Sequence, residues 1–438
     1  MEEENRPAAF GFFDALAPAY VAVRSLTRSI AAGVSPEDQM VQSCPEASPM
    51  KWHQAHTTWF FETFVLRPFL TDYKPFHEGF RWLFNSYYNS LGEEVPEKRL
   101  RASLSRPSLD EVIAFRTHVD DAMGKLLAGG IEEETARRIM LGLSHEQQHQ
   151  ELMLTDIKHA FFSNPLRPTY DAAPLVGENG ASAPDLIWHH FDEGVTEIGH
   201  SLQPTSCLDF CFDNETPRHK VHLEAFRIAS RSVTCREYME FMTQGGYSRP
   251  DLWLSDGWDL VKKRGWQAPL YWELDARDIT GWRVFTLRGW YPLSALLETP
   301  VCHVSFFEAD AFARWRGCRL PAEAEWELAA SDRWMPGNLL DTGKLHPGIV
   351  SSDGTYQLIG DCWEWTASPY LGYPGYKPLP GPLGEYNGKF MSGQMILRGG
   401  SCVTPANHLR VTYRNFFPPA TRWQFSGIRL ASYAGEAR

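Results

Sequence analysis

The sequence lacks the features by which several common classes of protein are known. No apolar run reaches the roughly 18 residues of a membrane span, and the first residues are acidic where a secretory signal peptide is basic. The net charge is -12, and no tract gathers Lys and Arg, which argues against nucleic acid as a partner. From these absences we expect a cytoplasmic protein that binds neither a membrane nor nucleic acid.

Two kinds of short motif are also missing. The eight cysteines are scattered and none belongs to a CxxC pair, so we expect free thiols rather than a thiolate zinc site or a disulfide framework. The nearest approach to a phosphate-binding loop, residues 337–344, has the wrong spacing, and Leu345 stands where Ser or Thr is required. Nucleotide binding is therefore not expected.

Helical spacing of apolar residues marks the first part of the chain, residues 1–165. It covers the ranges 10–32, 48–69, 108–127 and 132–162, with Ser48 and Ser108 as the expected N-caps. Four helices of this length predict a four-helix bundle.

The rest of the 438-residue chain has a different pattern. Residues 166–185 are rich in Pro, Gly and Ala, which is typical of a linker. Residues 186–438 turn frequently, with short strands expected at 220–223 and 396–397 and helices at 234–242 and 306–316. The chain's 16 Trp, 16 Tyr and 26 Phe supply anchors for such a loop-rich domain, so the expected fold class is α+β.

Histidines form the strongest chemical signal. His145 and His149 are four residues apart in an expected helix, so both rings project from one face, where two imidazoles can hold one metal ion. His56 shares a face with Trp52 and Trp59, and burying a histidine unsatisfied there would cost about 1–3 kcal/mol. The bundle therefore predicts a three-histidine metal site, and the donor set leaves zinc and iron both open.

Two other histidine interpretations are weaker. His53 lies at the edge of the apolar face and is the less favoured ligand. The sequence of residues 145–149 matches the HExxH motif of zinc proteases, but Glu146 does not lie on the same face of the expected helix as His145.

Polar and aromatic clusters supply the remaining candidates. Tyr87 and Tyr88 lie in a polar loop between expected helices and could supply a proton, and nearby Arg81 could bind a carboxylate or cap a helix. Residues 413–429 combine aromatic side chains with Asn and Arg, a combination that suits a small zwitterion. A loop-rich core anchored by aromatics explains that cluster equally well.

Several stretches together resemble known families. Residues 48–66 and 144–157 resemble a DinB-like domain. Residues 232–238, 320–327, 360–366 and 398–401 resemble a formylglycine-generating-enzyme/sulfatase-modifying domain of C-type-lectin-like fold. This order of two domains resembles the EgtB family, the iron-dependent sulfoxide synthases of ergothioneine biosynthesis.

The resemblance implies an activity. An Fe(II) ion held by His56, His145 and His149 would serve the joining of a thiol sulfur to the imidazole C2 of hercynine (N-alpha-trimethylhistidine), with O2, to give a sulfoxide. The thiol is cysteine or gamma-glutamylcysteine, and the branch that the tyrosine pair resembles tends toward cysteine.

The resemblance also implies roles for residues around the metal. Gln148 would lie beside the hercynine imidazole, and Asn415 and Phe416, with Phe417 next to them, would hold its carboxylate and trimethylammonium groups. Tyr87 or Tyr88 would donate a proton. Arg81 and Arg414 are the candidates for the carboxylate of the thiol substrate.

Three rival functions remain at this point. A DinB-type thiol transferase would use a metal such as zinc and no oxygen. A formylglycine-generating oxidase needs a pair of C-terminal cysteines, and Thr404 and Leu409 stand where we expect that pair. A binding module would retain hercynine without turnover. The sequence leaves open the thiol donor, a structural cation in the second domain and the oligomeric state, a homo-oligomer included.

Overall fold

A computed structural model describes residues 15–92, 95–175, 181–201, 209–331, 337–350 and 358–435. Its contacts divide the chain into two compact units. Unit 1 comprises Met1–Ala160 together with Ser201–Phe212 and Pro378–Tyr386. Unit 2 comprises Phe161–His200, Asp213–Lys377 and Asn387–Arg438. Two short segments that follow residue 200 in the sequence thus belong to the first unit.

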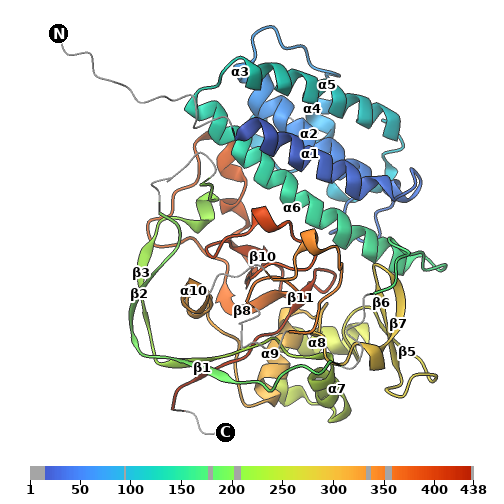
Figure 1. The fold of residues 1–438 in the computed structure, drawn as a ribbon, viewed down its shortest axis with the longest axis vertical. Coiled ribbons are helices and arrows are strands. Elements are labelled where there is room, and N and C mark those ends of the chain that lie inside the picture. The colour runs from blue at the N-terminus through green and yellow to red at the C-terminus, as the bar shows by residue number, and fades with distance from the viewer. Residues whose placement is uncertain are drawn as a thin grey trace. The chain divides into compact units, whose positions relative to one another are not determined.

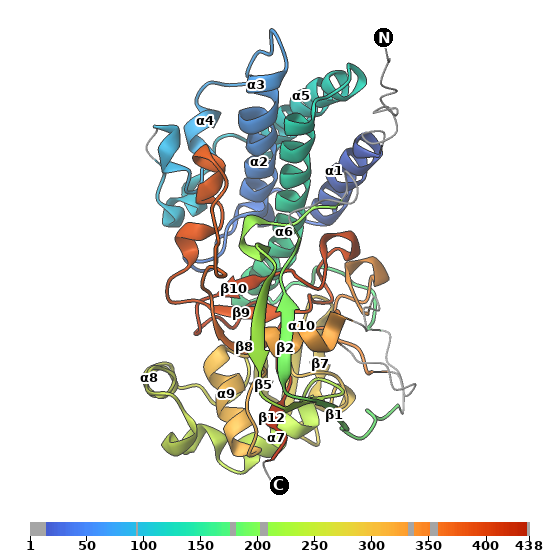
Figure 2. The ribbon, with the colours of Figure 1, turned by 90° about the vertical axis from the view of Figure 1, so that its left-hand side faces the viewer.

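Unit 1 is built on four long helical segments. These are α1 (Leu16–Ala32), α2 (Met50–Phe61), α5 (Leu109–Ala128) and α6 (Glu133–Ser163). The end of α6, from Phe161 on, belongs to unit 2. One π-helical turn (Glu62–Leu66) continues α2 into α3 (Arg67–Phe69), and α4 (Phe80–Leu83) follows. Both views show α2 running beside α5 (Figures 1 and 2). The predicted helical bundle is confirmed, while residues 10–14 of the first expected helix lie outside the described part.

The starts of two helices test the predicted N-caps. Ser108 caps α5 as expected, because its hydroxyl accepts from the Glu111 amide while the Glu111 carboxylate accepts from the Ser108 amide. The prediction for Ser48 is wrong, since α2 begins at Met50 without a side-chain cap. The Ser48 amide instead donates to Asp156 on α6, and its hydroxyl accepts from Arg101. Tertiary partners have replaced the local cap.

The described residues of unit 2 form four small sheets joined by loops. Strand order is β1-β4-β12, β10-β9-β8-β11, β2-β3 and β5-β6-β7, and all pairs are antiparallel except β11 with β8. The strands are β1 (Trp188–Phe191), β2 (Gly194–Ile198), β3 (His219–Leu223), β4 (Phe226–Ala229), β5 (Trp272–Leu274), β6 (Trp282–Thr286), β7 (Gly289–Pro292), β8 (Trp363–Pro369), β9 (Met395–Arg398), β10 (Asn415–Phe417), β11 (Ser426–Gly427) and β12 (Ala431–Tyr433).

The helices that accompany these sheets are α7 (Cys235–Thr243), α8 (Ser255–Arg264), α9 (Phe306–Trp315) and α10 (Glu323–Ser331). The expected strands at 220–223 and 396–397 fall within β3 and β9, and the expected helices correspond to α7 and α9. α8 and α10 were not predicted. The α+β class is confirmed, and no helix in the described ranges combines the length and apolarity that a membrane crossing needs.

Buried ion pairs accompany the apolar core around β8 and β9. The Arg398 guanidinium contacts Glu323 and Glu327 of α10, and Arg429 is paired with Glu364 of β8. All five side chains are buried. Charged residues of three motifs seen in the sequence (320–327, 360–366 and 398–401) therefore form buried ion pairs in unit 2.

The sequence predicted free thiols rather than disulfides. Cys44, Cys235, Cys302 and Cys362 are free cysteines, as predicted.

Candidate metal centre

Two helices of unit 1 bring the three predicted histidines together. His56 of α2 faces His145 and His149 of α6, and one ring nitrogen from each lies within 4.8 Å of the others. The ring centroids are 4.9 Å apart for His56 with either partner and 4.6 Å apart for His145 with His149. We call these residues the histidine triad. Figure 1 shows both parent helices, α2 in blue and α6 in green.

A glycine permits the close approach of the two helices. Gly142 lies one turn before His145, and a Cβ atom there would stand only 2.7 Å from the ring of Phe61 at the end of α2. Glycine inside a helix costs about 1 kcal/mol relative to alanine. That cost is offset here by the packing of α6 on α2, which sets the separation of the histidines.

The ring of His56 is fixed by contacts on three sides. Trp52 and Trp59 stack on its two faces at centroid distances of 4.5 Å and 5.5 Å, each 13° from parallel. Its Nδ1 lies 2.6 Å from the carbonyl oxygen of Phe84, to which it donates. The other nitrogen, Nε2, is buried without a hydrogen-bond partner among the described residues. His56 is therefore oriented to offer the lone pair of Nε2.

The donor set of the triad fits a metal ion. Both nitrogens of His145 are buried without a hydrogen-bond partner among the described residues, a state that costs about 1–3 kcal/mol per group. Burial lowers the pKa of His145 to about 3 and holds the pKa values of His56 and His149 well below the usual range. Three neutral imidazoles with free lone pairs suit Zn²⁺ or Fe²⁺, which such ligands leave partly open to further ligands.

Glu146 is occupied elsewhere. It is fully buried and accepts hydrogen bonds from Arg24 at 2.8 Å, Arg116 at 3.0 Å and Thr27 at 2.6 Å. Burial alone would raise its pKa, but the two guanidinium groups outweigh burial and lower the pKa to about 2. Its carboxylate joins α6 to α1 and α5, so it does not act as the general base of an HExxH site.

Three tyrosines and a glutamine gather near the triad. Tyr87 and Tyr88 lie in the loop after α4 with their ring centroids 4.7 Å apart, and Tyr88 is fully buried. Tyr386 lies 6.3 Å from Tyr87 and 5.5 Å from His145, and its hydroxyl donates to the side-chain oxygen of Gln148. Burial raises the pKa values of Tyr87 and Tyr88 above their usual range, so both are phenols at neutral pH.

Sequence reasoning missed Tyr386. It is 238 positions from Gln148, and no local periodicity connects the two. Its segment is held against the tyrosine loop by Glu385, which accepts from the amide of Asn89 at 3.2 Å and from that of Ser90 at 2.9 Å.

A buried guanidinium near the triad was also missed. Arg101 lies over the ring of Trp52 at 3.4 Å and donates to the hydroxyls of Ser48 and Ser86 at 2.8 Å each. Within the described ranges no carboxylate pairs with it. Burial lowers its pKa to about 9. By contrast, the predicted Arg81 is partly exposed in α4.

The remaining predicted residues lie in unit 2. Phe416 of β10 stacks on Tyr370 at 4.0 Å and 8°, and Phe417 meets Trp423 edge-on at 6.0 Å. The Asn415 side-chain oxygen accepts from the Phe416 amide at 2.9 Å. These contacts make an aromatic cluster whose β10 members are partly exposed.

Arg414 is a buried structural cation. Its guanidinium forms a two-pronged ion pair with Glu323, at 2.7 Å and 3.1 Å. It also donates to the carbonyl oxygens of Asn214 and Leu371, at 2.7 Å and 2.9 Å. These contacts give the predicted role in substrate binding no support.

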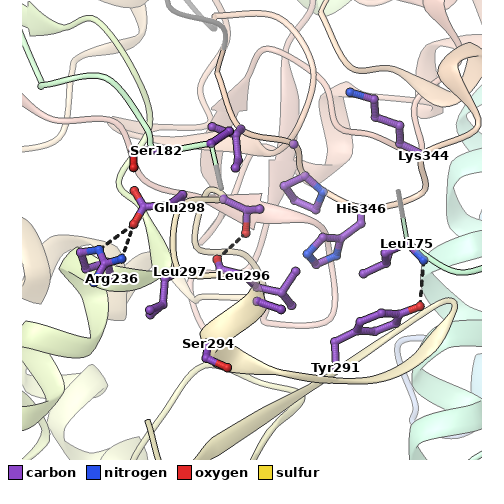
Figure 3. Close-up of a pocket in the computed structure, with 16 residues that line it drawn as sticks. Leu175, Ser182, Arg236, Tyr291, Ser294, Leu296, Leu297, Glu298, Lys344 and His346 are labelled. Carbon is purple, nitrogen blue, oxygen red and sulfur yellow. Dashed lines mark hydrogen bonds and ion pairs between the residues drawn. The ribbon is translucent and has the colours of Figure 1, made fainter. Parts of the chain in front are cut away.

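Unit 2 also contains a separate hollow of about 540 Å³. Figure 3 shows it, with Arg236 paired to Glu298 on one side and Tyr291 accepting from the amide of Leu175 on the other. No member of the triad is among the described residues that line it. It is distinct from the candidate metal centre.

Comparison with known families agrees with both parts of the chain. Residues 19–153 match the DinB superfamily, and residues 181–348 and 341–434 match the sulfatase-modifying factor enzyme 1-like domain.

Two hercynine oxygenases align with both parts of the chain, and a third relative aligns with about half of it. The chain is 30% identical to hercynine oxygenase of Mycolicibacterium smegmatis over 426 residues, which cover 88% of this chain and 91% of that protein. It is 30% identical to the hercynine oxygenase of Mycobacterium tuberculosis over 419 residues, again 88% and 91% of the two chains. Ergothioneine biosynthesis protein 1 of Schizosaccharomyces pombe is 25% identical over 255 residues, which are 54% of this chain and 30% of that one. With its DinB part, its sulfatase-modifying part and a histidine triad in place, the chain belongs to the hercynine oxygenase family.

Proposed function

We propose that the protein joins the sulfur of cysteine or gamma-glutamylcysteine to C2 of the hercynine imidazole, using O2 and an iron ion at the histidine triad. In this reaction the carbon gives up its C2 hydrogen and the thiol its proton. One oxygen atom ends on sulfur as the sulfoxide and the other leaves as water. The observation that carries the proposal is the buried set of three neutral imidazoles in a chain 30% identical to hercynine oxygenases over both domains.

His56, His145 and His149 would hold the metal. A bound Fe(II) would supply electrons to O2 and open positions for the substrates, since three protein ligands leave room for others. The rings of Trp52 and Trp59 exclude water from one side of the centre and keep His56 in place.

Gln148 and Tyr386 support the placement of hercynine beside the triad. Gln148 lies between the two ligand histidines of α6 in sequence, and Tyr386 bonds its side-chain oxygen. That bond orients the Gln148 amide beside the triad.

Tyr87 and Tyr88 would deliver the proton that oxygen reduction requires. A phenol is protonated at neutral pH, as a general acid needs to be, and burial raises the pKa values of both groups further. Tyr386 is a third candidate for the same role, because its ring lies 5.5 Å from His145.

The trimethylammonium and carboxylate groups of the substrates need residues that bind them. Phe416 and Phe417 offer aromatic faces to a trimethylammonium group, and Asn415 offers an amide to a carboxylate. For the carboxylate of the thiol we retain Arg81 as predicted and add Arg101, whose buried guanidinium bonds only neutral hydroxyls among the described residues.

The deciding experiment is mass spectrometry of the product from hercynine, Fe(II), and cysteine or gamma-glutamylcysteine in separate reactions under ¹⁸O2. The expected product is a hercynyl thioether sulfoxide with one ¹⁸O atom. Product formation that continues without oxygen would instead support a DinB-type thiol transferase.

Variants of the triad provide the matching test of the metal site. We expect His56→Ala, His145→Ala and His149→Ala each to lose iron, measured by elemental analysis of the purified protein. Full iron occupancy in all three variants would contradict the assignment.

A further inference from the structure

His53 links the triad to a carboxylate. It lies one turn before His56 on α2 and is only 2% exposed. Its Nδ1 is 2.7 Å from Nδ1 of His149, and its Nε2 is 3.0 Å from a carboxylate oxygen of Asp156. Asp156, His53 and His149 therefore form one hydrogen-bonded chain within unit 1, running from α6 to α2 and back to α6.

The acceptor at one end fixes where the protons lie. A carboxylate only accepts hydrogen bonds, and the same oxygen of Asp156 also accepts from the Ser48 amide at 2.8 Å. His53 must therefore carry its proton on Nε2. A neutral imidazole has one such proton, so Nδ1 of His53 is an acceptor and Nδ1 of His149 is the donor. The lone pair of His149 is then on Nε2.

His56 reaches the same state by a simpler route, since its Nδ1 donates directly to the carbonyl oxygen of Phe84. The two helices thus orient their ligands differently, one through a backbone carbonyl and one through a side-chain relay. Partners of this kind raise the basicity of a ligand histidine and hold its ring in place.

We propose that His53 and Asp156 are positioning residues of the metal centre. They hold His149 in the tautomer that binds metal through Nε2. The negative charge of Asp156 polarises the ring of His53, and this makes Nε2 of His149 a stronger lone-pair donor to the metal. This inference rests on the proposed function of the triad.

A purely structural role for the same residues makes a different prediction. Removing a buried hydrogen bond would then lower the stability of the metal-free protein and leave the properties of the bound metal unchanged. Metal affinity and the spectrum of a bound metal separate the two roles.

The test compares His53→Phe and Asp156→Asn with the wild type. His53→Phe keeps an aromatic ring and removes both hydrogen bonds, while Asp156→Asn keeps an acceptor oxygen and removes the charge. His118→Asn is the matched control, because His118 is on α5 and its Nε2 bonds the carbonyl oxygen of Lys74 at 2.9 Å. Affinity for Fe(II) and Co(II) is measured by competition with a chelator, and the Co(II) protein is examined by its visible absorption.

We expect His53→Phe to bind metal about 10–100-fold more weakly and Asp156→Asn about tenfold more weakly, both with an altered Co(II) spectrum. The control should match the wild type in both measurements. His53→Asn, which keeps an acceptor near the position of Nδ1, should recover part of the affinity lost in His53→Phe.

Two failures are distinguishable. If the wild type binds no metal, the proposed function of the triad fails. If the wild type binds metal, and His53→Phe and Asp156→Asn bind it with unchanged affinity and spectrum, the triad stands and the positioning role is overturned. Should His53→Phe not fold, the nearly isosteric Asp156→Asn decides alone by the same two measurements.

Discussion

At the scale of single residues, burial shifts the pKa values of the groups on which the proposed chemistry depends. Burial lowers the pKa values of the triad imidazoles, which favours their neutral form, and raises the pKa values of Tyr87 and Tyr88, which holds their protons more tightly. The proposed reaction would use both kinds of group, the imidazoles to bind metal and a phenol to donate a proton.

The tyrosine pair is open to a direct test. The double variant Tyr87→Phe/Tyr88→Phe should form sulfoxide about 10²–10⁴-fold more slowly, because it loses a positioned general acid. Its dissociation constant for hercynine, measured by calorimetry without oxygen, should remain that of the wild type. Tyr73→Phe is the control, since Tyr73 bonds Glu62. A double variant as fast as the wild type would move the role to Tyr386.

At the scale of elements, one carboxylate joins three helices. Glu146 of α6 contacts Arg24 and Thr27 of α1 and Arg116 of α5, and it is 0% exposed. Since Glu146 is next to His145 in sequence, this network fixes the rotation of α6 and so the direction in which the ligand projects.

Removal of that carboxylate should be costly. Glu146→Ala leaves two buried guanidinium groups without it, and we expect the free energy of unfolding to fall by about 3–5 kcal/mol. Glu133→Ala removes an exposed i,i+4 pair with Arg137 on the same helix and should cost no more than about 0.5 kcal/mol. Urea unfolding followed by circular dichroism measures both. Equal losses in the two variants would contradict the network.

At the scale of the whole molecule, unit 2 depends on buried ion pairs. Burial on its own would raise the pKa of Glu323, but Arg414 and Arg398 outweigh burial and lower it. A carboxyl group with a lowered pKa stabilises the fold above its usual pKa of about 4.5, and this stabilisation is lost as the pH falls through the lowered value.

Acid should therefore destabilise the wild type more steeply than a variant without this group. We expect the free energy of unfolding of Glu323→Gln to be lower at pH 7 and to change less with pH below about 4.5. Urea titrations over this pH range measure the difference, with the exposed Glu224→Gln as the control. Parallel pH profiles for the wild type and Glu323→Gln would exclude the ion pair as the cause.

Metal binding should also stabilise the molecule. A ligand that binds only the folded state adds about 2.7 kcal/mol at a free concentration one hundred times its dissociation constant. Removing metal with a chelator should then lower the melting temperature of the wild type, and Fe(II) added without oxygen should restore it. His145→Ala should show no such shift in calorimetry, and a shift as large as that of the wild type would place the metal elsewhere.

Local patterns predicted those parts of the molecule that depend on neighbouring residues. Apolar spacing identified the long helices, and the i,i+4 histidines with the inward-facing His56 identified the triad. Helix α10 escaped prediction because its face toward the core contains Glu323 and Glu327, whose charges are paired with Arg398, far along the chain. A periodicity of apolar residues does not register buried charges.

The same limit explains what was missed at the site. Ser48 looked like a cap because the local sequence allows it, and its real partners, Asp156 and Arg101, are more than 50 residues away. Tyr386 and the relay through His53 likewise depend on contacts between distant segments. Only the resemblance to a family indicated which residues distant in sequence lie close together in the fold. It indicated the tyrosine pair and not Tyr386.

The membership of Pro378–Tyr386 in unit 1 has a consequence for the modularity of the chain. A polypeptide cut after residue 165 would keep all three histidines and lose Tyr386, together with the Glu385 carboxylate that accepts from the amides of Asn89 and Ser90. The parts of the chain before and after residue 165 are therefore not independent domains. Exchanging either half for that of another protein would part the loop of Asn89 and Ser90 from the segment whose Glu385 accepts from it.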